Sequence, residues 1–458
     1  MRSSLRVAPR VGLRRLTAGV VSGGVLAVTM VGVGVGAAQA VPNPLAYEQF
    51  AYATQVSVGG TLTSGPTFPA GISCTTLPGL LSTGGGVVDI PGLLTGTAVF
   101  QSASTSEQAP NNRQVAVTRS TVASVNLLGG LVALTGLGVT STAVNNGTTI
   151  SSNGAVSLGS LSVLGIGIPL GSIGANTVIP IPLLGSITLN EQTLLPTGIR
   201  TVGVHVRITA GPNAGLDLVI GSTQSRFLPK PPVFLTGLAY SNLIAAGPIS
   251  VKPLIAQSVP CNGGTYTSNL VGISLPGLLT TGVISATGTA VLGNPTSIGS
   301  SRLNLAGLNL LNGLITASAI TSQANASKTT NLPPTLNAAG TQFVDLTVAG
   351  IHLPVSVAPN TFIPLPGLGY VVLNRQVQTA TSLEVRAVEV VVQVAGVLPV
   401  GAVVRLGVAS IGATDNGVPP ASAPLDAHDS LALSIGHDAE LCASSPDPAK
   451  CLAVGPSL

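Results

Sequence analysis

Few side chains in this sequence are suited to acid–base or metal chemistry, and they are scattered along the chain. His205 lies in the run VHVR and His352 in the run GIHLP. An internal repeat, described below, aligns His205 with Glu389 and His352 with Gly167. A catalytic imidazole is not expected to survive replacement by a carboxylate or a glycine, because neither titrates near neutral pH in its place. We therefore interpret both histidines as ordinary strand residues, and no GxSxG motif with plausible aspartate and histidine partners accompanies them.

A second group of candidate ligands lies near the C-terminus, in the runs DAHDS and GHDAE. Its carboxylates and imidazoles belong to Asp426, His428, Asp429, His437, Asp438 and Glu440. Ligands of this kind bind hard cations or zinc. Their spacing matches no metal-binding loop, so a solvated acidic tail is favoured over a metal site. The sequence therefore predicts neither a metal nor a cofactor.

Four cysteines are available for disulfide formation. Cys442 and Cys451 are nine residues apart in a proline-bearing segment, which favours a local disulfide between them. Cys74 and Cys261 occupy equivalent positions in the two repeats. They can bridge the repeats, remain separate thiols, or each pair with a tail cysteine. The absence of a CxxC motif or a Cys–His spacing argues against a metal centre.

The repeat is a long internal duplication. The run NTVIPIPLLGSITLNEQ at residues 176–192 returns as NTFIPLPGLGYVVLNRQ at residues 360–376, with ten of 17 positions identical. Other matching runs recur in the same order at offsets of 183–188 residues. A period this long indicates two complete domains rather than a solenoid. The predicted organisation begins with a signal peptide (residues 1–40) and a first domain (41–225). A proline-rich linker (226–235), a second domain (236–412) and an acidic tail (413–458) follow.

Each repeat carries the pattern of β-structure. Apolar and polar residues alternate in TVGVHVRIT at residues 201–209 and in LEVRAVEVVVQV at residues 383–394. Glycine, asparagine and proline recur about every 8–12 residues, as they do in sandwiches and barrels. We predict an all-β fold, with two tandem homologous β-sandwich- or barrel-like domains and a short irregular acidic tail.

The repeated run itself predicts a hairpin at the edge of a sheet. Pro180 and Pro182 lie two residues apart, so both face the same way in an extended strand and neither can donate to a ladder. Prolines on an edge strand also discourage another chain from pairing there. Asn176 and Asn360 are predicted to initiate the entry turns of the two hairpins.

Amide side chains are retained after the turn in both repeats, at positions predicted to face outward. These residues are Asn190, Gln192, Asn374 and Gln376. They are the best candidates for a recognition surface. The alternative is that they form hydrogen bonds that hold the hairpin in place.

The first 40 residues have the features of a secretory signal peptide. Five arginines precede an apolar run from Ala18 to Ala37, and Ala38-Gln39-Ala40 is a small-x-small cleavage site. A retained anchor is the alternative, and the run LRRLT leaves a twin-arginine signal open beside ordinary export. We predict an extracytoplasmic protein, secreted or associated with the cell surface, without a transmembrane anchor once the signal is removed.

Charge is sparse in the rest of the chain. The chain has 18 Lys and Arg, so removing the five signal arginines leaves 13 against 14 Asp and Glu, and only 7% of all residues are charged. This balance gives no indication of a nucleic-acid partner. Weak charge repulsion between copies makes self-association or adsorption to a surface easier.

The runs APNTFIPLPGLGYVVLNRQ and NLLNGLITAS, with the length of the repeated unit, resemble the choice-of-anchor P family of secreted proteins of high-GC Gram-positive bacteria. The resemblance covers residues 45–225 and 236–412. It implies an exported, surface-associated β protein whose mode of attachment varies between members, and it implies no catalytic residues. The final run CLAVGPSL has no LPxTG-like signal, so covalent attachment to a cell wall is not expected.

The sequence therefore favours a non-enzymatic, exported structural protein of the cell envelope or the medium, with cell-envelope components or a second copy of itself as partners. One alternative is a glycan- or cell-wall-binding module, in which two copies would add avidity. The absence of tryptophan counts against it, since sugar-binding platforms usually use aromatic rings. A hydrolase without a recognisable motif is the third and least favoured hypothesis.

Overall fold

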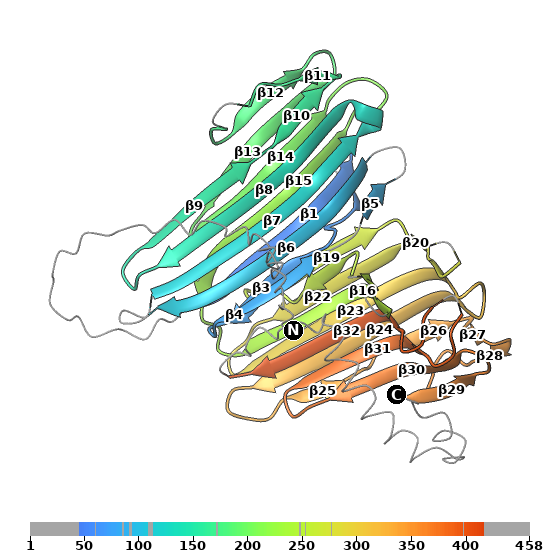
Figure 1. Ribbon diagram of the computed structural model, residues 1–458. Helices are drawn as coiled ribbons and strands as arrows, with labels where there is room; N and C mark the ends of the chain where they lie inside the picture. Colours follow the sequence, from blue (N-terminus) through green and yellow to red (C-terminus); the bar gives the residue numbers. More distant parts are fainter. Residues whose placement is uncertain are drawn as a thin grey trace, which may run out of the picture. The chain divides into compact units, whose positions relative to one another are not determined.

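The computed structural model describes residues 45–415, except residues 60, 85–86, 91–93, 109–112, 171–172, 247–248, 252, 276 and 397. All of these residues belong to one compact unit, residues 40–458. They form four antiparallel sheets and one short 3-10 helix, η1 (Leu128–Gly130), which confirms the predicted all-β fold (Figure 1). Among the described residues, no helix is long and apolar enough to cross a bilayer.

The first two sheets are formed by residues 45–229. The first sheet has the strand order β12-β13-β14-β15-β1-β2, with β3 beside β1. Its strands are β1 (Leu45–Val58), β2 (Thr61–Ser64), β3 (Ala70–Thr75), β12 (Thr177–Ile181), β13 (Gly185–Leu195), β14 (Gly198–Ile208) and β15 (Leu216–Pro229). The second sheet has the order β11-β10-β8-β7-β6-β4, with β5 beside β6 and β9 beside β8. Its strands are β4 (Gly79–Gly84), β5 (Val87–Ile90), β6 (Leu94–Gln108), β7 (Arg113–Leu127), β8 (Val132–Asn145), β9 (Ile150–Ser157), β10 (Ser160–Val163) and β11 (Ile166–Gly167).

The other two sheets are formed by residues 234–414. The third sheet has the order β17-β16-β32-β31-β30-β29, with β18 beside β16. Its strands are β16 (Phe234–Ala246), β17 (Ile249–Val251), β18 (Ala256–Ser258), β29 (Thr361–Leu365), β30 (Gly369–Gln378), β31 (Ser382–Val392) and β32 (Val403–Thr414). The fourth sheet has the order β19-β22-β23-β24-β27-β28, with shorter strands along its edges. Its strands are β19 (Gly264–Leu270), β20 (Ser274–Leu275), β21 (Leu279–Thr280), β22 (Ile284–Val291), β23 (Thr296–Leu310), β24 (Ile315–Thr329), β25 (Thr335–Asn337), β26 (Gln342–Val344), β27 (Thr347–Val348) and β28 (Ile351–His352).

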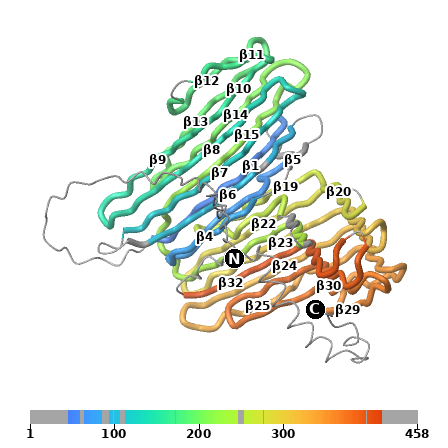
Figure 2. Tube along the Cα trace, in the orientation of Figure 1, coloured from blue at the N-terminus to red at the C-terminus, as the bar shows by residue number. Residues whose placement is uncertain are grey.

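Each pair of sheets encloses an aliphatic core and forms a β-sandwich. Val122 of β7 and Val204 of β14 belong to one buried cluster between the first and second sheets. Leu303 of β23 and Val388 of β31 belong to the corresponding cluster between the third and fourth sheets. Packing alternate residues of two sheets against each other is the standard way to bury strands that carry aliphatic residues at every second position. We call the two pairs the first and the second sandwich, and Figure 2 traces them in successive colours along the chain.

The strand order of the first sheet recurs in the third. Strands β12-β13-β14-β15-β1-β2 correspond in position to β29-β30-β31-β32-β16-β17, and β3 beside β1 corresponds to β18 beside β16. This recurrence supports the duplication inferred from the sequence, whereas the domain limits stay predictions. Of the predicted linker, residues 226–229 continue β15 and residues 234–235 begin β16.

The repeated run forms an edge hairpin in both sandwiches, as predicted. Among the strands that the structure describes, β12 pairs only with β13 and β29 only with β30, so each proline-bearing strand ends its sheet. Pro180 and Pro364 are exposed on these edge strands. The missing backbone donors of the prolines therefore leave no ladder hydrogen bond unmade inside a sheet.

Candidate functional site

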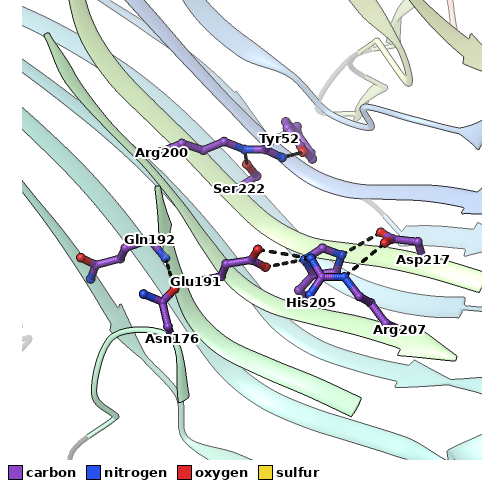
Figure 3. Close-up of polar contacts among 9 residues, drawn as sticks. All are labelled: Tyr52, Asn176, Glu191, Gln192, Arg200, His205, Arg207, Asp217 and Ser222. Atoms are coloured by element: carbon purple, nitrogen blue, oxygen red, sulfur yellow. Dashed lines mark hydrogen bonds and ion pairs between the residues drawn. The ribbon is translucent and has the colours of Figure 1, made fainter. Parts of the chain in front are cut away.

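The charged residues of the first sheet gather on its outer face, away from the sandwich core. Val204 and Val206 of β14 point into the core, so the alternate residues His205 and Arg207 point outward. Glu191 of β13 and Asp217 of β15 lie on either side of them (Figure 3). Three adjacent strands thus bring two acids and two bases together.

His205 is held between the two carboxylates. Its Nδ1 contacts Oε2 of Glu191, and its Nε2 lies 2.7 Å from Oδ1 of Asp217. Because each ring nitrogen faces an oxygen that only accepts, the doubly protonated imidazolium can donate to both. The Nη2 of Arg207 also lies 2.9 Å from Nδ1. A ring with an unprotonated Nδ1 can accept that hydrogen bond while its Nε2–H donates to Asp217, but it loses the hydrogen bond to Glu191, whose oxygen only accepts.

Arg207 completes the ion pairs of this cluster. Its Nη2 lies 3.3 Å from Oε1 of Glu191, and its Nε lies 3.5 Å from Oδ2 of Asp217. Burial raises the pKa of Glu191, but the hydrogen bond to His205 and the charges of His205 and Arg207 outweigh it and lower that pKa. The side chains of Arg207 and Asp217 are 42% and 41% exposed, so water screens much of their attraction. The arrangement places an imidazole and a guanidinium between two carboxylates, and both nitrogens of the histidine are engaged.

The equivalent positions of the second sandwich carry charges of the opposite sign. Glu191 corresponds to Arg375, and His205 corresponds to Glu389, which pairs with Val372 as His205 pairs with Thr188. The base–acid pair is therefore retained with its two ends exchanged. An exchange of this kind preserves the electrostatic attraction and removes the imidazole.

Three arginines surround Glu389. Its Oε2 accepts hydrogen bonds from Nη1 of Arg386 at 2.7 Å and from Nε of Arg405 at 2.6 Å. Its Oε1 accepts from Nη1 of Arg375. Burial raises the pKa of Glu389, but the positive charges of Arg386, Arg405 and Arg375 outweigh it and lower that pKa to about 2. Glu384 adds a second carboxylate, 2.5 Å from Nε of Arg386.

A tyrosine repeated in both sandwiches lies beside these clusters. Arg200 donates from Nη2 to the hydroxyl oxygen of Tyr52 at 2.9 Å, and its Nε lies 3.5 Å from Oγ of Ser222 (Figure 3). The corresponding Tyr240 is fully buried, and burial raises the pKa of its phenol. The arginine–tyrosine contact again joins neighbouring outer-face residues of one sheet.

The four predicted amides hydrogen-bond within their own domains. Gln192 donates from Nε2 to Oδ1 of Asn190 at 2.9 Å and lies 3.0 Å from the carbonyl oxygen of Gly154. Asn190 donates from Nδ2 to the carbonyl oxygen of Ile173 at 3.3 Å. In the second sandwich, Asn374 donates to the carbonyl oxygen of Val357 at 2.8 Å, and Gln376 lies 3.2 Å from Asn374 Oδ1. The two asparagines tie each hairpin to the loop before it, and Gln192 also bonds β9 of the second sheet. The recognition surface stays a prediction.

The entry asparagines fasten the hairpins as well. The backbone N–H of Gln192 donates to Oδ1 of Asn176, and that of Gln376 donates to Oδ1 of Asn360, both at 2.9 Å. Asn176 and Asn360 have φ angles of 58° and 57°. Asparagine tolerates this left-handed conformation better than most residues. Both copies therefore use asparagine because it tolerates a positive φ and because its Oδ1 accepts a backbone hydrogen bond.

Replacing Asn374 with alanine should lower the free energy of unfolding by about 2 kcal/mol, because it removes a buried hydrogen bond and places a Cβ without a polar group in the left-handed region. Asn374 has a φ of 48° and is 6% exposed. Replacement with glycine should cost about 1 kcal/mol less, because glycine adopts this φ without strain. Denaturant unfolding of both variants measures the difference, and equal losses would contradict the conformational part of the argument.

Cys74 and Cys261 are joined by a disulfide between the two sandwiches, with their Cα atoms 4.8 Å apart. The sequence left this bridge open beside separate thiols and pairing of each cysteine with the tail. Cys442 and Cys451 lie outside the described residues, as do the acidic and histidine residues of the tail. Within the described part of the chain, groups of three or more His, Cys, Asp or Glu residues suited to a metal ion are absent.

Comparisons of this chain with protein-family models, with curated proteins and with solved structures found no match. The resemblance to the choice-of-anchor P family therefore stays a prediction based on the repeated runs.

Proposed function

We propose that this protein is a non-enzymatic, exported structural protein of the cell envelope or the medium, built from two tandem β-sandwiches. The observation that carries the proposal is the exchange of Glu191 and His205 for Arg375 and Glu389 at equivalent positions. What both copies retain is an ion pair across two strands. A requirement for stability accounts for that pattern, whereas a requirement for an imidazole does not.

Export is supported by two further features. The N-terminal sequence has a basic region, an apolar run and a cleavage site ending at Ala40. The Cys74–Cys261 disulfide suits an oxidising compartment, where such bonds persist. Both features are consistent with a protein displayed outside the cytoplasm.

Fractionation of producing cells tests the location. We expect the protein in the envelope or medium fraction, with an N-terminus at Val41 by N-terminal sequencing. A cytoplasmic protein that retains Met1 would refute export. Labelling of the purified protein by an activity-based serine-hydrolase probe would refute the non-enzymatic part of the proposal.

A glycan-binding function is the second candidate, and the outer face of the fourth sheet favours it. Hydroxyl and amide side chains form cross-strand pairs there, among them Thr265 with Thr289 and Thr267 with Thr287, each with Oγ1 atoms 3.1 Å apart. Farther along the sheet, Nε2 of Gln323 donates a hydrogen bond to Oδ1 of Asn325 at 2.8 Å. A face of regularly spaced hydroxyls and amides, with Arg302 beside Thr287 as a charged residue on it, can hydrogen-bond a polysaccharide.

Binding of the intact protein to purified cell wall and to soluble glycans tests this second function. If the cross-strand threonine pairs bind the polysaccharide, replacing Thr265 and Thr267 together with valine should weaken retention of the protein on cell wall. Thr97→Val is the matched control, because Thr97 is an exposed threonine that bonds Ser124 in the same way on the second sheet. No retention of the unaltered protein on either material would remove this candidate.

A further inference from the structure

The outer face of the third sheet is apolar as well as charged. It carries two buried clusters on the side away from the core. The first contains Tyr240, Leu243 and Val408, and the second contains Tyr370, Val372, Val391 and Val403. The outer face of a sandwich sheet normally meets water and is polar. An apolar outer face therefore indicates that another layer covers it.

The ion cluster between these apolar patches is also withdrawn from water. The side chains of Arg375 and Arg405 are each 2% exposed, and that of Glu389 is 0% exposed. In the first sandwich, the side chain of Glu191, which corresponds to Arg375, is 26% exposed. Among the described strands, those of the fourth sheet pack on the other side of the third sheet, and β3 of the first sheet contacts β16 near Phe234. Neither contact includes the cluster of Tyr370, Val372, Val391 and Val403.

Taking several charges out of water is costly unless opposite charges and hydrogen bonds compensate for it. The outer face presents three arginines, Arg375, Arg386 and Arg405, against two carboxylates, Glu384 and Glu389. Counted over the described residues, the buried cluster has a formal charge of +1. An acidic cover with apolar residues would match both properties of the face.

We propose that the C-terminal segment, residues 416–458, covers the outer face of the third sheet and directs its carboxylates toward the arginine cluster. The segment starts at this sheet, because β32 ends at Thr414 and carries Arg405. Asp415 follows β32 directly and pairs with the buried Lys328 of β24 in the fourth sheet, whose Nζ lies 2.7 Å from its Oδ2. Residues 416–458 are 43 in number, which in extended form reach about 140 Å and can run back along a 12-residue strand of about 40 Å.

The composition of the segment fits this face. Its charged residues are Asp426, Asp429, Asp438, Glu440, Asp447 and Lys450, so its formal charge is −4. The run LALSI at residues 431–435 places Leu431, Leu433 and Ile435 at every second position. In an extended chain these three side chains share one side and can pack on the apolar clusters. The predicted signal, residues 1–40, is removed on export and is not a permanent cover.

Arginine modification in the full-length mature protein tests the proposal. Phenylglyoxal should modify Arg375, Arg386 and Arg405 slowly, as measured by mass spectrometry of peptides. Replacing the five acids of the segment with their amides should speed modification of these arginines several-fold. Arg302, which is exposed on the fourth sheet, is the internal control and should react equally in both proteins. Unchanged protection of the three arginines in the amide variant would overturn the proposal, as would protection that is lost on dilution, which would indicate a second copy as the cover.

A second measurement does not depend on how the variant folds. A specific protease site is inserted after Asn416 and cut once the protein has folded. The released segment should co-elute with the body at low salt and separate at high salt, because salt screens the attraction between its carboxylates and the arginines. Immediate separation at low salt would overturn the proposal.

Discussion

Replacing Glu389 with glutamine should lower the free energy of unfolding by about 3–5 kcal/mol, because a buried ion network would lose its central charge. Glu389 is 0% exposed and accepts from Arg375, Arg386 and Arg405. Glutamine keeps the shape and one acceptor oxygen, but it removes the negative charge that Arg375, Arg386 and Arg405 share. Denaturant unfolding followed by circular dichroism measures the loss.

Glu191→Gln is the matched control in the first sandwich. Glu191 faces His205 and Arg207 in the corresponding part of the first sheet, but its side chain is 26% exposed. Water screens a pair of this kind, so we expect a loss of about 1 kcal/mol or less. Equal losses in the two variants would contradict the view that burial makes the second cluster critical.

The same carboxylate should make stability depend on pH. Glu389 has a pKa of about 2 in the folded protein, against about 4.3 for an unperturbed glutamate. Between these values the unfolded chain binds the proton and the folded protein does not, so stability falls as the pH falls. The contribution of Glu389 is complete above about pH 4.3, and it is lost as the pH approaches 2. The free energy of unfolding of Glu389→Gln, measured from pH 6 to pH 2, should therefore decline less than that of the unaltered protein.

The hairpins show what the sequence predicts well here. Proline in a strand favours the edge of a sheet, and β12 and β29, which carry Pro180 and Pro364, are edge strands. That preference is local, so a short run is sufficient to infer it. The second proline of each run, Pro182 or Pro366, was expected in the same strand but lies in the turn that follows it. The alternation in β14 and β31 likewise identifies core-facing residues without knowledge of the partner strands.

The charge clusters were missed because they depend on strand register. His205 meets Glu191 and Asp217, which lie 14 and 12 residues away on two different strands. Spacing along one strand does not predict such contacts. The sequence did contain a signal, since Glu191 and His205 are replaced by Arg375 and Glu389 in the second copy. A joint exchange of sign at two aligned positions indicates that the two side chains are in contact.

The backbone conformation of Asn190 and Asn374 could not be predicted from the sequence either. Asn190 and Asn374 have φ angles of 53° and 48° within strands β13 and β30, and the ladder omits each of them from its pairing. Their side chains turn toward the preceding loops as a result. Asparagine is compatible with this conformation but does not require it. The outward orientation inferred from simple alternation therefore does not hold for these two residues, which are 5% and 6% exposed.

Replacing Cys74 and Cys261 together with serine should lower the free energy of unfolding by about 5 kcal/mol. The two cysteines are 187 residues apart, so the disulfide closes a very long loop. In the chain-entropy model, the unfolded chain regains the freedom that this closure removes. Both residues are buried beside Ala46, Leu228 and Phe234, so the serine hydroxyls would also lack an aqueous environment.

Chemical unfolding of the oxidised protein, the reduced protein and the double variant separates these two causes. If loop closure dominates, reduction alone should produce most of the loss, because it restores the freedom of the unfolded chain and leaves the buried sulfur atoms in place. If burial of the hydroxyls dominates, only the serine variant should be strongly destabilised. Equal stability of the oxidised and reduced proteins would mean that backbone contacts such as Gly65 with Asn269 hold the two sandwiches together without the disulfide. Non-reducing peptide mapping, which should recover a peptide pair linking Cys74 to Cys261, establishes that the oxidised sample carries the bond being tested.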